Sequence, residues 1–140
     1  MFIKQLSIFV ENKAGRLHSI MDALADKGIN ISALSIADTT DFGILRVIVS
    51  DADAAREILK AEGVISKITE VIAVYIDDRA GGLVAVLDHL SDAQIGIEYT
   101  YAFLGRTEGK ALMVLKADDM AKAAALLEEK GIKLAGETDI

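Results

Sequence analysis

The sequence predicts an α+β protein that contains two copies of one βαββαβ unit, at residues 1–70 and 71–140. The chain repeats itself at an offset of 66 residues, because ENKAGRLHSIMDALADKGINI at 11–31 aligns with DDRAGGLVAVLDHLSDAQIGI at 77–97. Within each copy, apolar residues recur at helical spacing, and short β-rich runs stand on either side of them. Similarity that persists at one offset indicates a tandem duplication of a structural unit.

In the first copy, a β-rich run at 5–10 is expected to form the first strand, and a helix follows it. One face of this helix carries apolar residues at positions i, i+3, i+4 and i+7, namely Leu17, Ile20, Met21 and Leu24. Strands are expected at 29–37 and 43–49, joined by the turn-rich sequence DTTDFG. A second helix is expected to begin at Asp51, and 64–70 is expected to form the last strand.

The second copy repeats this order. Its first helix carries the matching apolar stripe, which consists of Leu83, Val86, Leu87 and Leu90. The same offset aligns Gly43 with Gly109. Asp118 is expected to cap the second helix of this copy, and the final strand is expected at 132–138.

The order β-α-β-β-α-β is that of the ferredoxin-like fold. Right-handed crossovers then give an antiparallel sheet of strand order 4-1-3-2 with both helices on one face. The chain contains no proline, and no Gly/Ser-rich linker separates the copies. We therefore expect two such domains, 1–70 and 71–140, packed rigidly together.

Three aromatic residues of the second copy alternate onto one face of an expected strand: Tyr99, Tyr101 and Phe103. The matched residues of the first copy are all small: Ala33, Ser35 and Ala37. Large residues facing small ones would pack well between the copies, and aromatic side chains could equally line a ligand pocket. Both interpretations stay open.

Composition excludes several functions. The chain has 22 acidic and 15 basic residues and a formal net charge of -7, which opposes binding to nucleic-acid phosphates. It has no cysteine, so disulfides and thiolate metal sites are excluded, and we expect neither a metal nor a cofactor. The longest apolar run, 71–76, is too short to span a bilayer, and the N-terminus lacks a signal-peptide pattern. We expect a cytoplasmic protein that does not bind membranes.

Two short motifs carry a family resemblance. E-N-x-x-G-x-L begins at Glu11, and G-x-N-I begins at Gly28 after the amphipathic helix. With the βαββαβ order, this arrangement resembles the ACT domain, a regulatory module of amino-acid-pathway enzymes. The resemblance covers both copies, so the chain is similar to a stand-alone tandem ACT protein. It implies that an amino acid binds at an interface between paired ACT domains.

The resemblance also implies which residues bind. In serine-responsive phosphoglycerate dehydrogenases, which this stretch resembles, asparagines at the positions of Asn12 and Asn30 hold the effector, although Val10 and Ala14 here replace a histidine and a proline. The expected ligand-binding residues are Asn12, Lys13, Ala14, Gly15, Arg16, Leu17, Asn30 and Ile31. A second, weaker site is expected at Asp78, Gly81 and Leu83.

The physical chemistry of the first site agrees with this implication. Free N–H groups at a helix start suit a carboxylate, and a carboxamide oxygen can accept from an ammonium group. Both asparagines are therefore expected to bind one zwitterionic ligand. Capping of the helix by either asparagine is the structural alternative, and it stays open at this point. The second site lacks both carboxamides, because Asp78 and Gly96 stand at the matched positions.

We therefore predict a non-catalytic regulatory protein that senses an amino acid. An enzyme is the first rival, but His18 and His89 lie in helical patterns without metal-ligand partners by spacing. The second rival is an adaptor that binds no ligand and modulates a partner enzyme or transporter. The expected partners are a small amino acid, a second copy of the chain in a homodimer, and an enzyme of amino-acid metabolism.

Overall fold

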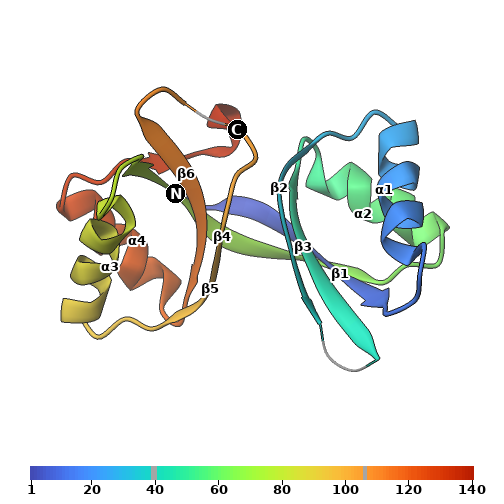
Figure 1. Ribbon diagram of the computed structural model, residues 1–140, viewed down its shortest axis with the longest axis horizontal. Helices are drawn as coiled ribbons and strands as arrows, with labels where there is room; N and C mark the ends of the chain where they lie inside the picture. The colour runs from blue at the N-terminus through green and yellow to red at the C-terminus, as the bar shows by residue number, and fades with distance from the viewer. Residues whose placement is uncertain (39–40, 106) are drawn as a thin grey trace. The chain divides into compact units, whose positions relative to one another are not determined.

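The computed structural model describes residues 1–38, 41–105 and 107–140. The chain forms two compact units. One unit is Lys4–Thr69, and the other combines Met1–Ile3 with Glu70–Ile140 (Figure 1). We call them the N-terminal and the C-terminal unit. The division of the chain into domains 1–70 and 71–140 stays a prediction.

The N-terminal unit has the element order that the sequence predicts. Its elements are β1 (Ile3–Glu11), α1 (Arg16–Asp26), β2 (Ile31–Asp38), β3 (Phe42–Val49), α2 (Ala52–Ala61) and the first part of β4 (Ser66–Asp77). β3 pairs antiparallel with both β1 and β2, and the strand order β2-β3-β1-β4 is the predicted 4-1-3-2. Both helices cover the same face of this sheet (Figure 1).

The C-terminal unit repeats this arrangement. Its elements are the second part of β4, α3 (Gly82–Asp92), β5 (Ile97–Ala102), β6 (Lys110–Ala117), α4 (Met120–Glu129) and β7 (Leu134–Ala135), followed by a 3-10 turn at Glu137–Asp139. β4 pairs antiparallel with β6 and β7, and β6 pairs with β5. The predicted α+β fold of two ferredoxin-like units is confirmed.

Three details of the prediction are wrong. The last strand of the first copy and the first strand of the second are one continuous strand, β4, since no turn residue interrupts 66–77. The final strand is only two residues long. The cap of α4 is Asp119, whose carboxylate accepts from the Lys122 N–H at 3.0 Å, and not Asp118.

The offset between the copies is also not constant. Val10 pairs with Gly43, and its counterpart Ile76 pairs with Ala111, so the offset rises from 66 at β4 to 68 at β6. The two additional residues lie in the connection between β5 and β6. Gly43 therefore corresponds to Ala111, and its predicted match with Gly109 is wrong.

The predicted helix stripes form the two cores. On α1, Ile20 and Leu24 are buried, while Leu17 at the start of the stripe is 38% exposed. On α3, Val86 and Leu90 are buried in the same way. Each core is almost entirely aliphatic, because leucine, isoleucine, valine and alanine make up both clusters of buried side chains.

In the part of the chain that the structure describes, no helix is long and apolar enough to cross a membrane.

Candidate functional site

The turn between β1 and α1 is held by backbone hydrogen bonds. The Asn12 N–H donates to the Asp41 carbonyl at 3.0 Å, and the Lys13 N–H donates to the Glu11 carbonyl at 2.8 Å. Gly15 then adopts φ 85° and ψ -10°, a left-handed conformation that is strained for residues with a side chain. This conformation turns the chain into α1.

The start of α1 presents unused hydrogen-bond donors. No side chain caps this helix. The Arg16 N–H donates to the Lys13 carbonyl at 3.2 Å, but the N–H groups of Leu17 and His18 have no hydrogen-bond partner among residues 1–38, 41–105 and 107–140. The helix dipole adds partial positive charge at this end. The turn can therefore accept a carboxylate.

A small cavity of about 90 Å³ lies beside this turn. Three of the predicted site residues line it, Asn12, Lys13 and Leu17. Ile36 of β2 and Gly43 of β3 also line it. Neither residue could be predicted from the sequence, since they come from a strand pair whose register only the structure gives. An ion pair between Lys13 and Glu11 at 3.2 Å lies at the same place.

The other predicted site residues do not line this cavity. Ala14 and Gly15 are exposed in the turn, and Arg16 is half-buried beside a separate cavity of about 50 Å³ between α1 and α2. Ile31 packs against the core of the N-terminal unit.

Asn30 lies at the opposite end of the sheet from Asn12. β1 pairs with β3 so that Val10 is opposite Gly43, and β2 pairs with β3 so that Ile31 is opposite Val49. The six residue steps along β3 from Gly43 to Val49 span about 20 Å at ~3.4 Å per residue. Within one unit, the two asparagines therefore cannot contact the same small ligand.

Neither asparagine caps a helix. Gly15 is the N-cap of α1 and Lys27 is its C-cap. The backbone of Asn30 is fixed by Ser50, since its N–H donates to the serine hydroxyl at 3.0 Å and its carbonyl accepts from the Ser50 N–H at 2.9 Å. The carboxamides themselves have no hydrogen-bond partner within the described ranges. The capping alternative is therefore wrong for both residues.

The matching turn of the C-terminal unit keeps the backbone conformation. Gly81 has φ 84° and ψ -4°, no side chain caps α3, and the Asp78 N–H donates to the Gly109 carbonyl at 3.1 Å. Leu83 is half-buried against the core. Asp78 is exposed and carries a negative charge where Asn12 carries a carboxamide.

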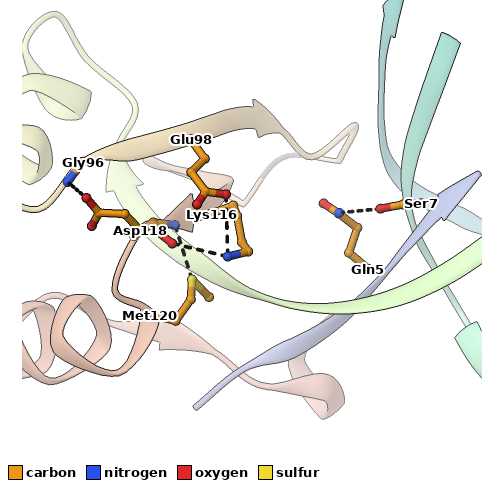
Figure 2. Close-up of polar contacts among 8 residues, drawn as sticks. Gln5, Ser7, Gly96, Glu98, Lys116, Asp118 and Met120 are labelled. Carbon is orange, nitrogen blue, oxygen red and sulfur yellow. Dashed lines mark hydrogen bonds and ion pairs between the residues drawn. The ribbon is translucent and has the colours of Figure 1, made fainter.

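The counterpart of Asn30 in the C-terminal unit is blocked. Figure 2 shows the carboxylate of Asp118 directed at Gly96, whose N–H donates to it at 3.1 Å. A Cβ atom on Gly96 would lie 2.8 Å from that carboxylate oxygen. Ser50, the matched residue of the N-terminal unit, is smaller and leaves room for Asn30. An asparagine at position 96 would require Asp118 to move.

Groups suited to catalysis are few. The described residues contain no set of three or more His, Asp or Glu side chains placed to hold a metal ion. The ammonium groups of Lys4 and Lys110 lower the pKa of Asp53 and Asp77, respectively, through hydrogen bonds and charge. Both carboxylates are on the surface in ion pairs, an arrangement that proteins use outside active sites as well.

Comparison with known proteins matches the whole chain. A family model described as "ACT domain pair" matches residues 1–140. The crystal structure of protein BT0572 from Bacteroides thetaiotaomicron is 42% identical, with a TM-score of 0.93, over 99% of this chain and 95% of that one. A search of curated proteins gives no match.

Two more distant structures share the fold. The ligand-free regulatory subunit of aspartate kinase from Thermus thermophilus is 16% identical, with a TM-score of 0.63, over 90% of this chain and 91% of that one. The regulatory subunit of aspartate kinase from Thermus flavus is 15% identical, with a TM-score of 0.61, over 90% of each chain.

Proposed function

Because the chain belongs to the family of ACT domain pairs, we propose that it is a non-catalytic regulatory protein that binds a small amino acid at an interface between ACT units. One observation carries the proposal. Among the described residues, the carboxamide of Asn12 has no hydrogen-bond partner and lies beside a cavity at the start of α1, where two backbone N–H groups also lack partners. These groups are complementary to the two charged ends of an amino acid.

The ligand would bind in one orientation. Its carboxylate accepts hydrogen bonds from the N–H groups of Leu17 and His18, where the helix dipole is favourable. Its ammonium group donates to the carboxamide oxygen of Asn12. Leu17 and Ile36 face the side chain of the ligand, and the cavity of about 90 Å³ limits that side chain to a small one.

Asn30 would contribute to a site from a second ACT unit. Its distance from Asn12 within one unit means that the two carboxamides can meet only across an interface. A homodimer would supply such an interface, and closed twofold association is the commonest form of protein oligomer. We therefore propose that the complete site, with Asn12, Lys13, Ala14, Gly15, Arg16 and Leu17 from one unit and Asn30 and Ile31 from another, forms on dimerisation.

The C-terminal unit would provide the weaker site at Asp78, Gly81 and Leu83. It retains the glycine turn, but Asp78 replaces one carboxamide and Asp118 occupies the place of the other. Asp78 adds negative charge near the position of the ligand's carboxylate, which weakens binding.

The structures of aspartate kinase regulatory subunits support the choice of partner. Those chains share the fold of this one and are named as regulatory subunits of an enzyme of amino-acid metabolism. We propose a partner enzyme of the same class, in the cytoplasm, and no contact with nucleic acid or membrane.

A thermal-shift screen against the twenty amino acids tests the proposal. A ligand at 100 times its dissociation constant adds about 2.7 kcal/mol to the free energy of unfolding. For a chain of this length, that corresponds to a rise in Tm of about 5–10 °C. A screen in which no amino acid raises Tm would contradict the sensor and favour the adaptor that binds no ligand. Light scattering that finds only monomer with bound ligand would contradict the shared site.

A further inference from the structure

A cavity of about 480 Å³ lies in the C-terminal unit, and Asp77 and Gly82, which flank the turn at 78–81, are part of its lining. It is bounded by the end of β4, the first two turns of α3 and residues 131–133. β7 pairs only with Ala73 and Val74, and the Tyr75 N–H donates to the Lys133 carbonyl at 3.0 Å. Ile76 and Asp77, which follow on β4, line the cavity. Ile76 and Asp77 thus lie beyond the backbone pairing with residues 133–135 and form one wall of the cavity.

In the N-terminal unit, the matching space beside α1 is nearly closed, whereas the counterparts of residues 131–133 line a separate cavity of about 490 Å³ beside α2. Four residues of α1 line the cavity of about 50 Å³ there: Arg16, Ser19, Ile20 and Ala23. The residues of α3 that match them at an offset of 66 line the large cavity: Gly82, Ala85, Val86 and His89. The space beside the first helix is therefore open in the C-terminal unit and nearly closed in the N-terminal unit.

The residue at the start of the helix accounts for the difference. Arg16 extends its side chain into the site, and its Nε atom is buried without a hydrogen-bond partner among the described residues. Gly82 has no side chain, and a Cβ atom there would lie 1.9 Å from the carbonyl oxygen of Asp77. The first turn of α3 is therefore packed closely against the end of β4, and no side chain of residues 1–38, 41–105 or 107–140 fills the space that Arg16 occupies in the other unit.

The cavity of the C-terminal unit also carries basic side chains at positions where the N-terminal unit has none. In the described part of the chain, three nitrogen-bearing side chains line it: His89, Lys110 and Lys133. At the matched positions, the N-terminal unit has only apolar side chains: Ala23, Phe42 and Ile65. The net charge of the whole chain is -7, so a basic lining is contrary to the composition of the protein. It favours an anionic ligand.

The single carboxylate in the lining is already engaged. Asp77 pairs with Lys110 at 2.5 Å and with Arg79 at 3.5 Å, so it is poorly placed to receive an ammonium group. Lys133 lies over the ring of Tyr75, with its Nζ atom 4.9 Å from the ring centre, and has no carboxylate partner among the described residues. It is free to pair with the carboxylate of a ligand.

We propose that this cavity binds a small organic carboxylate with a branched apolar body and no ammonium group, of which 4-methyl-2-oxopentanoate is a representative. The carboxylate pairs with Lys133, and His89 lies within the same lining. The apolar body packs on Ile76, Val86 and Ile132. This site is separate from the amino-acid site at Asn12 and does not depend on it.

A titration of the ¹⁵N-labelled full chain, followed by NMR, tests the proposal with two probes. 4-Methyl-2-oxopentanoate should shift the amide signals of Ala85, His89 and Ile132. Leucine, which has the same body and an added ammonium group, should bind there at least about tenfold more weakly. The proposal is overturned if these signals do not move with the oxo acid, or if leucine shifts them at equal concentration.

Four variants locate the binding. Lys133→Ile, which introduces the residue of the N-terminal unit, should weaken binding of the oxo acid about tenfold. Lys27→Ile removes the same charge from an exposed position of the other unit and should leave binding unchanged. Ala85→Phe fills the cavity from the exposed side of α3 and should abolish binding while the amide spectrum stays dispersed. Asn12→Ala should have no effect, and an equal loss in that variant would place the oxo acid in the amino-acid site instead.

Discussion

Asn12 is the side chain on which the proposed amino-acid site depends most. Sequence reasoning could find it, because the type of residue and its distance from a glycine turn and a helix start are local properties. The separation of Asn12 from Asn30 is not local. β1 and β2 both run antiparallel to β3 and hence in the same direction, so the end of one strand and the start of the other lie at opposite ends of the sheet. The sequence analysis assigned the two carboxamides to one ligand without this constraint.

Substitution at the asparagines should remove the response to the amino acid. Asn12→Ala and Asn30→Ala each delete a carboxamide that has no partner among the residues the structure describes, so the stability without ligand should stay within about 0.5 kcal/mol. The ligand-induced rise in Tm should fall by more than half in each. Asp78→Ala serves as the control, and thermal denaturation with and without ligand is the measurement. A greater loss in the control would mean that the C-terminal unit binds the amino acid.

The ion pair between Lys4 and Asp53 should make stability depend on acid pH. Their atoms lie 2.6 Å apart, and the lysine lowers the pKa of the Asp53 carboxyl below its ordinary value of 3.8. A lowered pKa stabilises the folded state above the ordinary pKa, and this contribution disappears as pH falls through the lowered value. Lys4→Ala should therefore reduce the fall in Tm between about pH 5 and pH 3 relative to the unsubstituted chain. An unchanged fall would contradict the role of this pair.

The apolar stripe of helix α1 contributes both to the core and to the proposed ligand site. The periodicity of the sequence correctly predicted the helix and its buried positions, since burial of one face follows from spacing alone. Leu17 belongs to the same stripe and was expected to bind the ligand; it is 38% exposed and lies beside the ligand cavity. Leu17 lies in the first turn of α1, directly after the turn that follows β1, and spacing alone does not show which position of a stripe adjoins a cavity.

Truncation of two leucines on α1 should distinguish the contribution to the core from the contribution to ligand binding. Leu24→Ala removes a fully buried side chain and should lower the free energy of unfolding by about 2–5 kcal/mol. Leu17→Ala is the matched control, with the same chemical change on the same helix, and should cost less than about 1 kcal/mol. Leu17→Ala should nevertheless weaken binding of the amino acid. Urea denaturation measures the free energy of unfolding of both variants. Equal losses in the two variants would contradict the assignment of Leu24 to the core and of Leu17 to the ligand site.

At the scale of the whole molecule, the duplication could be predicted and the exact boundary of its units could not. Repeated motifs identified two copies, because they survive in the sequence. The first three residues, however, belong to the C-terminal unit. Phe2 packs against its core, and the terminal amino group lies 3.8 Å from the Glu128 carboxylate. Nothing in the pattern of residues 1–3 indicates this packing, because three residues carry no periodicity.

Loss of the Phe2 side chain should therefore weaken the unit that is distant in sequence. In Phe2→Ala, hydrogen exchange should accelerate at the amides of α4 and β7, which belong to the same core, and not at those of α1. Phe9→Ala is the control, since this phenylalanine of β1 is half exposed. Exchange that accelerates in α1 alone would contradict the assignment of the first residues to the C-terminal unit.

Strand β4 constrains how the gene for this protein can be rearranged. Duplicated domains are usually joined by a linker, at which recombination can exchange, lose or transplant one copy without harm. Here the copies share one twelve-residue strand, and the segment before the first copy packs with the second. A breakpoint at residue 70 would leave one fragment with a shortened edge strand and the other without Phe2. The duplication is therefore expected to be inherited as a single indivisible module, and half-length descendants should be rare.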